Sequence, residues 1–244
     1  MVNIESLKKN HFTKYLLDFI VIVFSITVSF WLNEKSIDIQ DEKARINVLS
    51  SLQREVYEIK EYCEEREATW QKDISLLDQF LYPRNGVLDV DSILTLTQSK
   101  YRIETFFLIY RVFDPPMNRY YSIINSGDLR YVNSEKIKEI LSRLHNTSFS
   151  YVETTVEYEK QLKQSFLPFL STNHPKFILA TDDLDVDFNA YLGILDEAIQ
   201  NDEKFKAKLI MIRRYLGIKL MFLDLYRKSL NELEKEISIV LDEG

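Results

Sequence analysis

Basic and aromatic side chains gather between residues 110 and 138 of an otherwise acidic chain. The net charge is −7, yet this segment interleaves arginine and lysine with tyrosine. Arginine can neutralise phosphate and tyrosine can stack on bases, so the combination is typical of sites that bind a nucleotide or a short single strand. The candidate ligand-binding residues are Arg111, Arg119, Tyr120, Tyr121, Arg130 and Tyr131, together with Arg213 and Arg214 if the last helix brings them there.

The same residue types also have an ordinary structural interpretation. Tyrosines are often half-buried in helical cores, and arginines pair with acids, of which this chain has 38 against 31 lysines and arginines. The composition favours this interpretation. It also argues against a general duplex-DNA binder, which normally presents a strongly basic face.

Other patterns that could carry chemistry are incomplete. Asp183, Asp185 and Asp187 alternate as in a calcium loop, but Phe188 takes the glycine position and Ile194 the twelfth position. The three histidines lack metal-ligand spacing, and no serine elbow or glycine-rich phosphate loop can be found. We therefore expect no enzyme, no metal site and no cofactor.

One apolar run, from Tyr15 to Leu32, has the length of a membrane span. About 18 residues at ~1.5 Å each cover roughly 27 Å, close to the thickness of a hydrocarbon core. Lysines precede it, and Tyr15 and Trp31 occupy positions typical of interfacial aromatics. A cleaved signal peptide is the alternative. The run is long for a signal core and ends in bulky residues, so we interpret it as a retained membrane helix.

Polar side chains line one face of that helix. Asp18, Ser25, Ser29 and Asn33 fall within a narrow stripe at 100° per residue. Turning a carboxylate and hydroxyls toward lipid is costly, and the chain has no second apolar run. We therefore expect a homo-oligomer of three to five copies whose spans meet through this stripe. Alternatively, Asp18 stays at the wet interface and the serines bond to their own helix.

The remaining sequence indicates an all-α fold, an elongated helical bundle continuous with the membrane helix. We divide the chain into a basic leader (1–14), the span (15–32), a connecting coiled-coil-like helix (33–81) and a helical soluble sensor domain (82–244). Residues 33–81 contain no Pro or Gly, and their apolar residues, including Cys63, recur at heptad spacing.

Within the soluble part, short apolar periods and breakers place the other elements. Residues 101–113 fit either a helix or a buried strand, residues 171–187 a loop, and Asp91 the cap of a short helix. Further helices are expected over 117–126 with Gly127 as a left-handed cap, from about 134 to 166, over 188–200, and from about 202 to 241, the last antiparallel to residues 33–81.

A resemblance adds to this picture. The basic leader, the span running into Leu32–Lys35, and the central segment Tyr120–Leu129 resemble a bacterial family of single-span membrane proteins with a helical soluble domain. The layout is similar to that of oligomeric membrane effectors of bacterial anti-phage defence. This resemblance implies a pore or ion channel opened by a nucleotide or oligonucleotide signal, and it supplies no catalytic residues.

The resulting hypothesis is a ligand-gated effector in the bacterial inner membrane, a single-pass protein with its soluble domain in the cytoplasm. The positively charged residues flanking the span are nearly balanced, so they do not fix this orientation. The rival from another class is a membrane-anchored scaffold that docks a partner protein and forms no pore.

Overall fold

The computed structural model describes residues 4–242, with side chains from residue 14 onward. The side chains of Lys8, Lys9 and His11 in the leader therefore lie outside the described residues. The structure is 88% helical and has no strand in its described part, which confirms the all-α prediction. The elements are α1 (Ile4–Leu81), η1 (Arg84–Gly86), α2 (Val90–Thr97), α3 (Lys100–Leu108), α4 (Asn118–Ser126), η2 (Asp128–Tyr131), α5 (Glu135–Ser142), η3 (Arg143–Ser148), α6 (Phe149–Gln164), α7 (Phe166–Asn173), α8 (Pro175–Asp182), α9 (Phe188–Asn201) and α10 (Glu203–Asp242).

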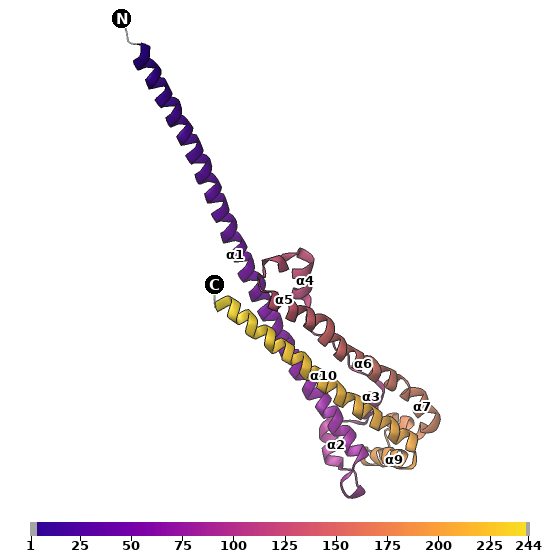
Figure 1. The fold of residues 1–244 in the computed structure, drawn as a ribbon. Coiled ribbons are helices and arrows are strands. Elements are labelled where there is room, and N and C mark those ends of the chain that lie inside the picture. Colours follow the sequence, from indigo (N-terminus) through magenta and orange to yellow (C-terminus); the bar gives the residue numbers. More distant parts are fainter. Residues whose placement is uncertain (1–3, 243–244) are drawn as a thin grey trace.

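Helix α1 is one unbroken helix whose first half stands away from the rest of the molecule (Figure 1). It has no Pro or Gly to interrupt it before Pro83. Burial begins at Val48, and the heptad positions from Leu49 to Leu81 are then buried or partly buried. Asn85 and Gly86 turn the chain with positive φ angles of 55° and 72°, and α1 ends at Leu81, where the connecting helix is expected to end.

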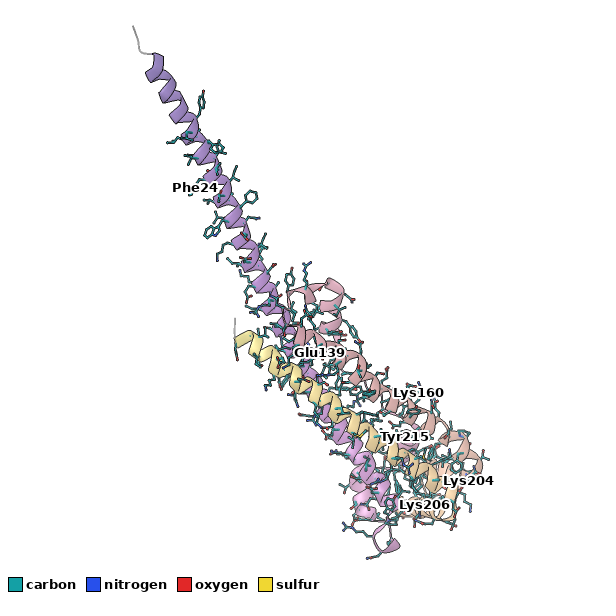
Figure 2. All side chains as sticks on the ribbon, in the orientation of Figure 1. Phe24, Glu139, Lys160, Lys204, Lys206 and Tyr215 are labelled. Carbon is teal, nitrogen blue, oxygen red and sulfur yellow. The ribbon has the colours of Figure 1, made fainter. Side chains whose placement is uncertain are left out.

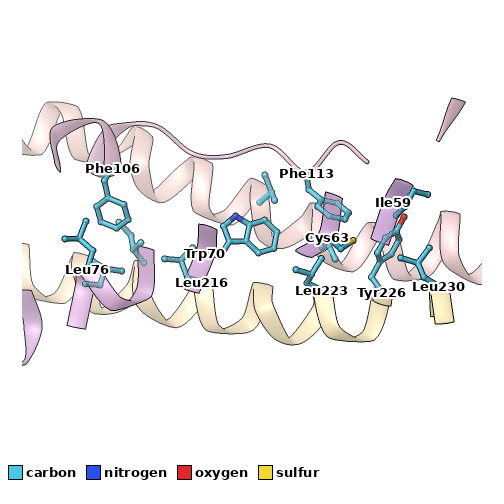
Figure 3. Packing of buried hydrophobic residues seen from close by; sticks show 14 of the residues in the cluster. Ile59, Cys63, Trp70, Leu76, Phe106, Phe113, Leu216, Leu223, Tyr226 and Leu230 are labelled. Carbon is cyan, nitrogen blue, oxygen red and sulfur yellow. The ribbon is translucent and has the colours of Figure 1, made fainter. Parts of the chain in front are cut away.

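Helix α10 packs antiparallel along the second half of α1, as the two apolar stripes predict (Figure 1). Polar contacts between the helices show the antiparallel order, because partners later in α1 are earlier in α10. Arg45 donates to the Val240 carbonyl, and Lys60 pairs with Glu234. Near its other end, α1 pairs with Arg213. Between them lies a row of apolar and aromatic side chains that includes Cys63, Trp70 and Tyr226 (Figure 3).

The segment from 101 to 113 begins as a helix, which is one of its two expected conformations, and it forms no strand. Helix α3 ends at Leu108, and residues 109–117 then run extended across the bundle. Phe113 anchors this extended segment, with its ring 5.4 Å from Tyr226 and 6.3 Å from Trp70. The Tyr62 hydroxyl of α1 accepts a hydrogen bond from the Asp114 N–H at 2.7 Å. This backbone N–H therefore has a partner although it lies outside any helix.

Several local predictions are confirmed. Gly127 caps α4 with a φ of 76°, and Ser134 caps α5 by accepting the Ile137 N–H. The helix expected from 134 to 166 is present as α5 and α6, joined by the π-helical turn η3. Helices α9 and α10 occupy the ranges expected for them, and Asp202 caps α10.

Two local predictions are wrong. The cap of α2 is Asp89, which accepts the Ser92 N–H, and not Asp91. Residues 171–187 are not a loop, because α8 forms from 175 to 182. Pro175 is the first residue of α8, where a missing N–H costs nothing, so this proline starts a helix. The Lys100 ammonium caps the C-terminus of α8. It donates to three carbonyls at and after the helix end, those of Ala180, Asp183 and Val186.

Candidate functional site

The apolar run on α1 is one segment that is long and apolar enough to cross a membrane. None of it is buried by the rest of the described chain, so it is not a core helix of this fold. Phe24, for example, is 68% exposed and projects from the isolated half of α1 (Figure 2). A contiguous exposed apolar surface of this kind is typical of membrane or protein interaction sites.

The polar stripe on this segment is partly satisfied by the helix itself. Ser25 Oγ donates to the Val21 carbonyl at 2.7 Å, and Ser29 Oγ donates to the Ser25 carbonyl at 2.8 Å. The alternative in which the serines bond to their own helix is therefore present in the structure. Asp18 and Asn33 are exposed. The two serines and Asn33 also line a shallow groove beside Ile26 and Phe30.

Arg119 and Tyr120 serve to dock α4 onto α1. The buried Glu55 carboxylate accepts the backbone N–H groups of Arg119 and Tyr120 at 2.7 and 2.9 Å, and so caps α4 from another helix. Burial raises the pKa of Glu55, although these two N–H groups oppose the shift. The Arg119 guanidinium forms a two-pronged ion pair with Glu58. Tyr121 is exposed next to this contact.

Tyr120 also covers the buried His145. Its ring stacks on His145 with centroids 3.6 Å apart and planes within 7°. The His145 Nδ1 lies 3.1 Å from the Met117 sulfur. Burial lowers the pKa of His145 to about 4, so the ring is neutral at physiological pH.

Arg130 and Tyr131 face an acidic part of α1 near the start of the bundle. Arg130 lies over the Tyr131 ring at 4.8 Å and donates to its hydroxyl at 2.8 Å. Three carboxylates, Asp38, Asp41 and Glu42, line the shallow pocket beside them. With more carboxylates than arginines, this pocket does not favour phosphate.

Arg213 does not join these residues. It pairs through two hydrogen bonds with Asp78, which lies 20 positions after Glu58 on α1, or ~30 Å along the helix. Arg214, the next residue of α10, is exposed. Arg213 and Arg214 of the last helix therefore do not join the basic and aromatic residues of segment 110–138, contrary to the prediction. Arg111, Arg119 and Arg213 are paired with acids at separate positions along α1, as the ordinary interpretation expects.

Arg111 lies beside a group of buried charges that the sequence did not predict. Arg111 Nε lies 3.3 Å from the Asp73 carboxylate, and Asp73 is 8% exposed. Behind this pair, Glu159 bridges the ammonium groups of Lys163 and Lys219. All three of these side chains are at most 1% exposed. Lys163 also donates to the Ile109 carbonyl at 2.8 Å.

A sequence signal for these lysines does exist. Lys219 lies three residues after Leu216 and four before Leu223, a position of the buried stripe where an apolar residue is expected. Lys163 lies seven residues after Val156 and three before Phe166. The neighbouring Leu220 is only partly buried, so Lys219 takes the fully buried position on this side of α10. Lysine is almost never fully buried without a partner, so such positions are informative.

The acidic run around Asp187 and the single cysteine, Cys63, have structural roles. Asp187 of the acidic run caps α9 by accepting the Ala190 N–H at 2.7 Å. No group of three potential metal ligands is present among the described residues. Cys63 is buried in the core, where burial raises the pKa of its thiol to about 12.

Comparisons with protein-family models, with curated proteins and with solved structures found no match to this chain.

Removing the shared carboxylate should strongly destabilise the bundle. We expect Glu159→Gln to lower the free energy of unfolding by about 3 kcal/mol or more, because two buried ammonium groups lose their common partner. Glu157→Gln, an exposed neighbour on the same helix, should change it by less than about 0.5 kcal/mol. Chemical denaturation of the solubilised chain measures both. Equal effects of the two variants would contradict a structural role for the buried charges.

The buried histidine predicts a specific loss of stability in acid. The unfolded state gains a proton on His145 near its ordinary pKa of 6.5, whereas the folded state resists until about pH 4. Stability contributed by neutral His145 is therefore complete above the unfolded pKa and declines as the pH falls through this window. Between about pH 7.5 and 5 the loss should be about 2 kcal/mol.

His145→Phe provides the control, since it keeps an aromatic ring against Tyr120 and cannot take up a proton. Denaturation curves for both proteins at the two pH values should show that about 2 kcal/mol of pH dependence disappears in the variant. An unchanged pH dependence would exclude His145 as its source.

Proposed function

We propose that this chain is an oligomeric membrane effector in which the soluble bundle controls a pore or ion channel formed by the spans of three to five copies. The observation that carries the proposal is the continuity of α1, whose first part is the apolar span and whose second part is the central helix of the bundle. A displacement of the bundle is thus transmitted to the span without an intervening hinge.

The exposed apolar surface supports the membrane part of the proposal. From Tyr15 to Leu32 nearly every large hydrophobic side chain is at least 45% exposed. A surface of this extent is unfavourable in water. The proposed setting is the bacterial inner membrane with the bundle in the cytoplasm, in anti-phage defence, and it rests on the resemblance in layout alone.

The polar stripe supports assembly through one face. Asp18 and Asn33 mark its two ends, and small serines between them leave a groove into which a second helix fits closely. In a closed assembly the stripe faces the other copies, and opening exposes it to water. A signal opens the pore only if it binds the open state more tightly than the closed one.

The second candidate is a membrane-anchored scaffold that docks a partner protein and has no pore. It is favoured by one observation: Ser25 and Ser29 already donate to carbonyls of their own helix, so these hydroxyls need no second chain. On this alternative the apolar segment serves only to tether the bundle.

Cysteine crosslinking in membranes tests which face of the span is shared. We expect Ser29→Cys to give disulfide-linked dimers on mild oxidation, because the copies approach through the stripe to within the ~7 Å that a disulfide allows. Phe24→Cys, on the opposite face, should remain monomeric. Native Cys63 gives little background, since it is buried and its thiol has a raised pKa. Crosslinking at position 24 but not at 29 would contradict the assembly.

Current recordings in planar bilayers separate the pore from the tether. We expect the wild-type chain to conduct and a variant carrying an unrelated apolar helix in place of residues 15–32 to be silent, because a pore depends on its lining and a tether does not. Asp18→Ala should change the conductance or the ion preference, as it removes the charge at one end of the stripe. Equal behaviour of wild type and swapped span would favour the scaffold.

A further inference from the structure

A pocket opens where α1, α2, α3 and the extended segment meet, in front of the buried charges. It has a volume of about 380 Å³ and adjoins a smaller cavity of about 60 Å³. Asp73, Arg102, Phe106 and Arg111 line both cavities, and Lys163 closes the inner one. Pockets that hold small ligands typically start at about 300 Å³, so the outer cavity is large enough for a molecule of mononucleotide size.

The pocket carries an excess of positive charge. Lys72, Arg102, Arg111 and Lys163 line the two cavities together with a single carboxylate, Asp73. Asp73 pairs with Arg111. The side chains of Lys72 and Arg102 form no ion pair within the described part of the chain, and both residues are exposed at the pocket mouth.

The charges behind the pocket do not offset this excess. Glu159 is shared between Lys163 and Lys219, so one carboxylate serves two ammonium groups. Burial lowers the pKa of Lys219, and the Glu159 carboxylate opposes this shift. In a protein with a net charge of −7, this concentration of cations is the arrangement that an anionic ligand completes.

The walls of the pocket define the rest of the ligand. Leu76, Leu96 and Phe106 form an apolar side, while Thr97 and Gln98 add hydrogen-bonding groups at the end of α2. We propose that this pocket binds a phosphate-bearing small molecule of mononucleotide size. Its phosphate lies between Arg102, Arg111 and Lys72, and its ring lies against the apolar wall.

A lipid headgroup of the same membrane cannot supply the phosphate. Asp73 lies 41 residues after Leu32 on one continuous helix, which places the pocket ~60 Å from the end of the span. Even a tilt of about 40° leaves ~45 Å between the pocket and the membrane surface. The ligand is therefore a soluble molecule. Naming it as the signal rests on the proposed function, whereas its binding does not.

Isothermal titration of the full-length chain in detergent tests the site with three probes: inorganic pyrophosphate, adenosine monophosphate and uncharged adenosine. We expect saturable binding of the two phosphate-bearing probes that weakens with added salt, and no binding of adenosine. The double variant Lys72→Gln/Arg102→Gln should weaken binding about tenfold or more, because two charge-assisted contacts are lost. Both side chains are exposed, so the fold should be retained.

The matched control removes the same charge elsewhere. Arg54→Gln/Lys204→Gln changes two exposed cations, one on α1 and one on α10, that do not line the pocket (Lys204 is marked in Figure 2). Its affinity should stay within about twofold of the wild type. Absence of binding by both phosphate-bearing probes, or equal weakening in the two double variants, would overturn the proposal. A silent bilayer recording would not, since it concerns the span alone.

Discussion

The constraint on which this structure depends is that a single helix must be stable in two surroundings. An uninterrupted α-helix satisfies its own backbone N–H and C=O groups in any surroundings, so α1 can pass from an exposed apolar segment into a protein core without a break. Only the side chains change along it. They are apolar on nearly all sides from Tyr15 to Leu32, and they form a single buried stripe from Val48 onward. The remaining helices of the bundle are built around that second half.

The sides of α1 next to this stripe also organise the charges of the domain. Its acids lie at intervals, and bases from distant segments pair with them in turn: Arg119 with Glu58, Arg227 with Glu67, Arg111 with Asp73, and Arg213 with Asp78. Half-exposed pairs of this kind contribute little stability individually. Their effect is to fix where each segment docks, and this explains why bases that are clustered in the sequence are dispersed in space.

The buried charges form an exception to this arrangement. Trp70 and Phe106 each have a lysine ammonium over the ring, at 4.5 and 4.7 Å, so the two lysines are held between aromatic faces and one shared carboxylate. Replacing such a group by apolar residues is often neutral or stabilising, so stability alone does not account for it. A role in completing an anion site accounts both for the excess of cations and for their position behind an open pocket. That pocket includes α1 itself, the helix that also carries the exposed apolar segment.

The sequence by itself determined the class of fold, the apolar segment, and most of the helices, because these depend on periodicity and on local capping residues such as Asp202, Gly127 and Ser134. It also determined that Asp18, Ser25, Ser29 and Asn33 share a face, since helical geometry fixes this within one element. The tertiary structure alone decided which arginines meet, that Arg213 pairs far from Arg119, and that Lys163 and Lys219 share Glu159. These outcomes depend on how distant segments dock. The energy of each polar pair follows from its burial, and burial is a property of the assembled bundle rather than of any stretch of the chain.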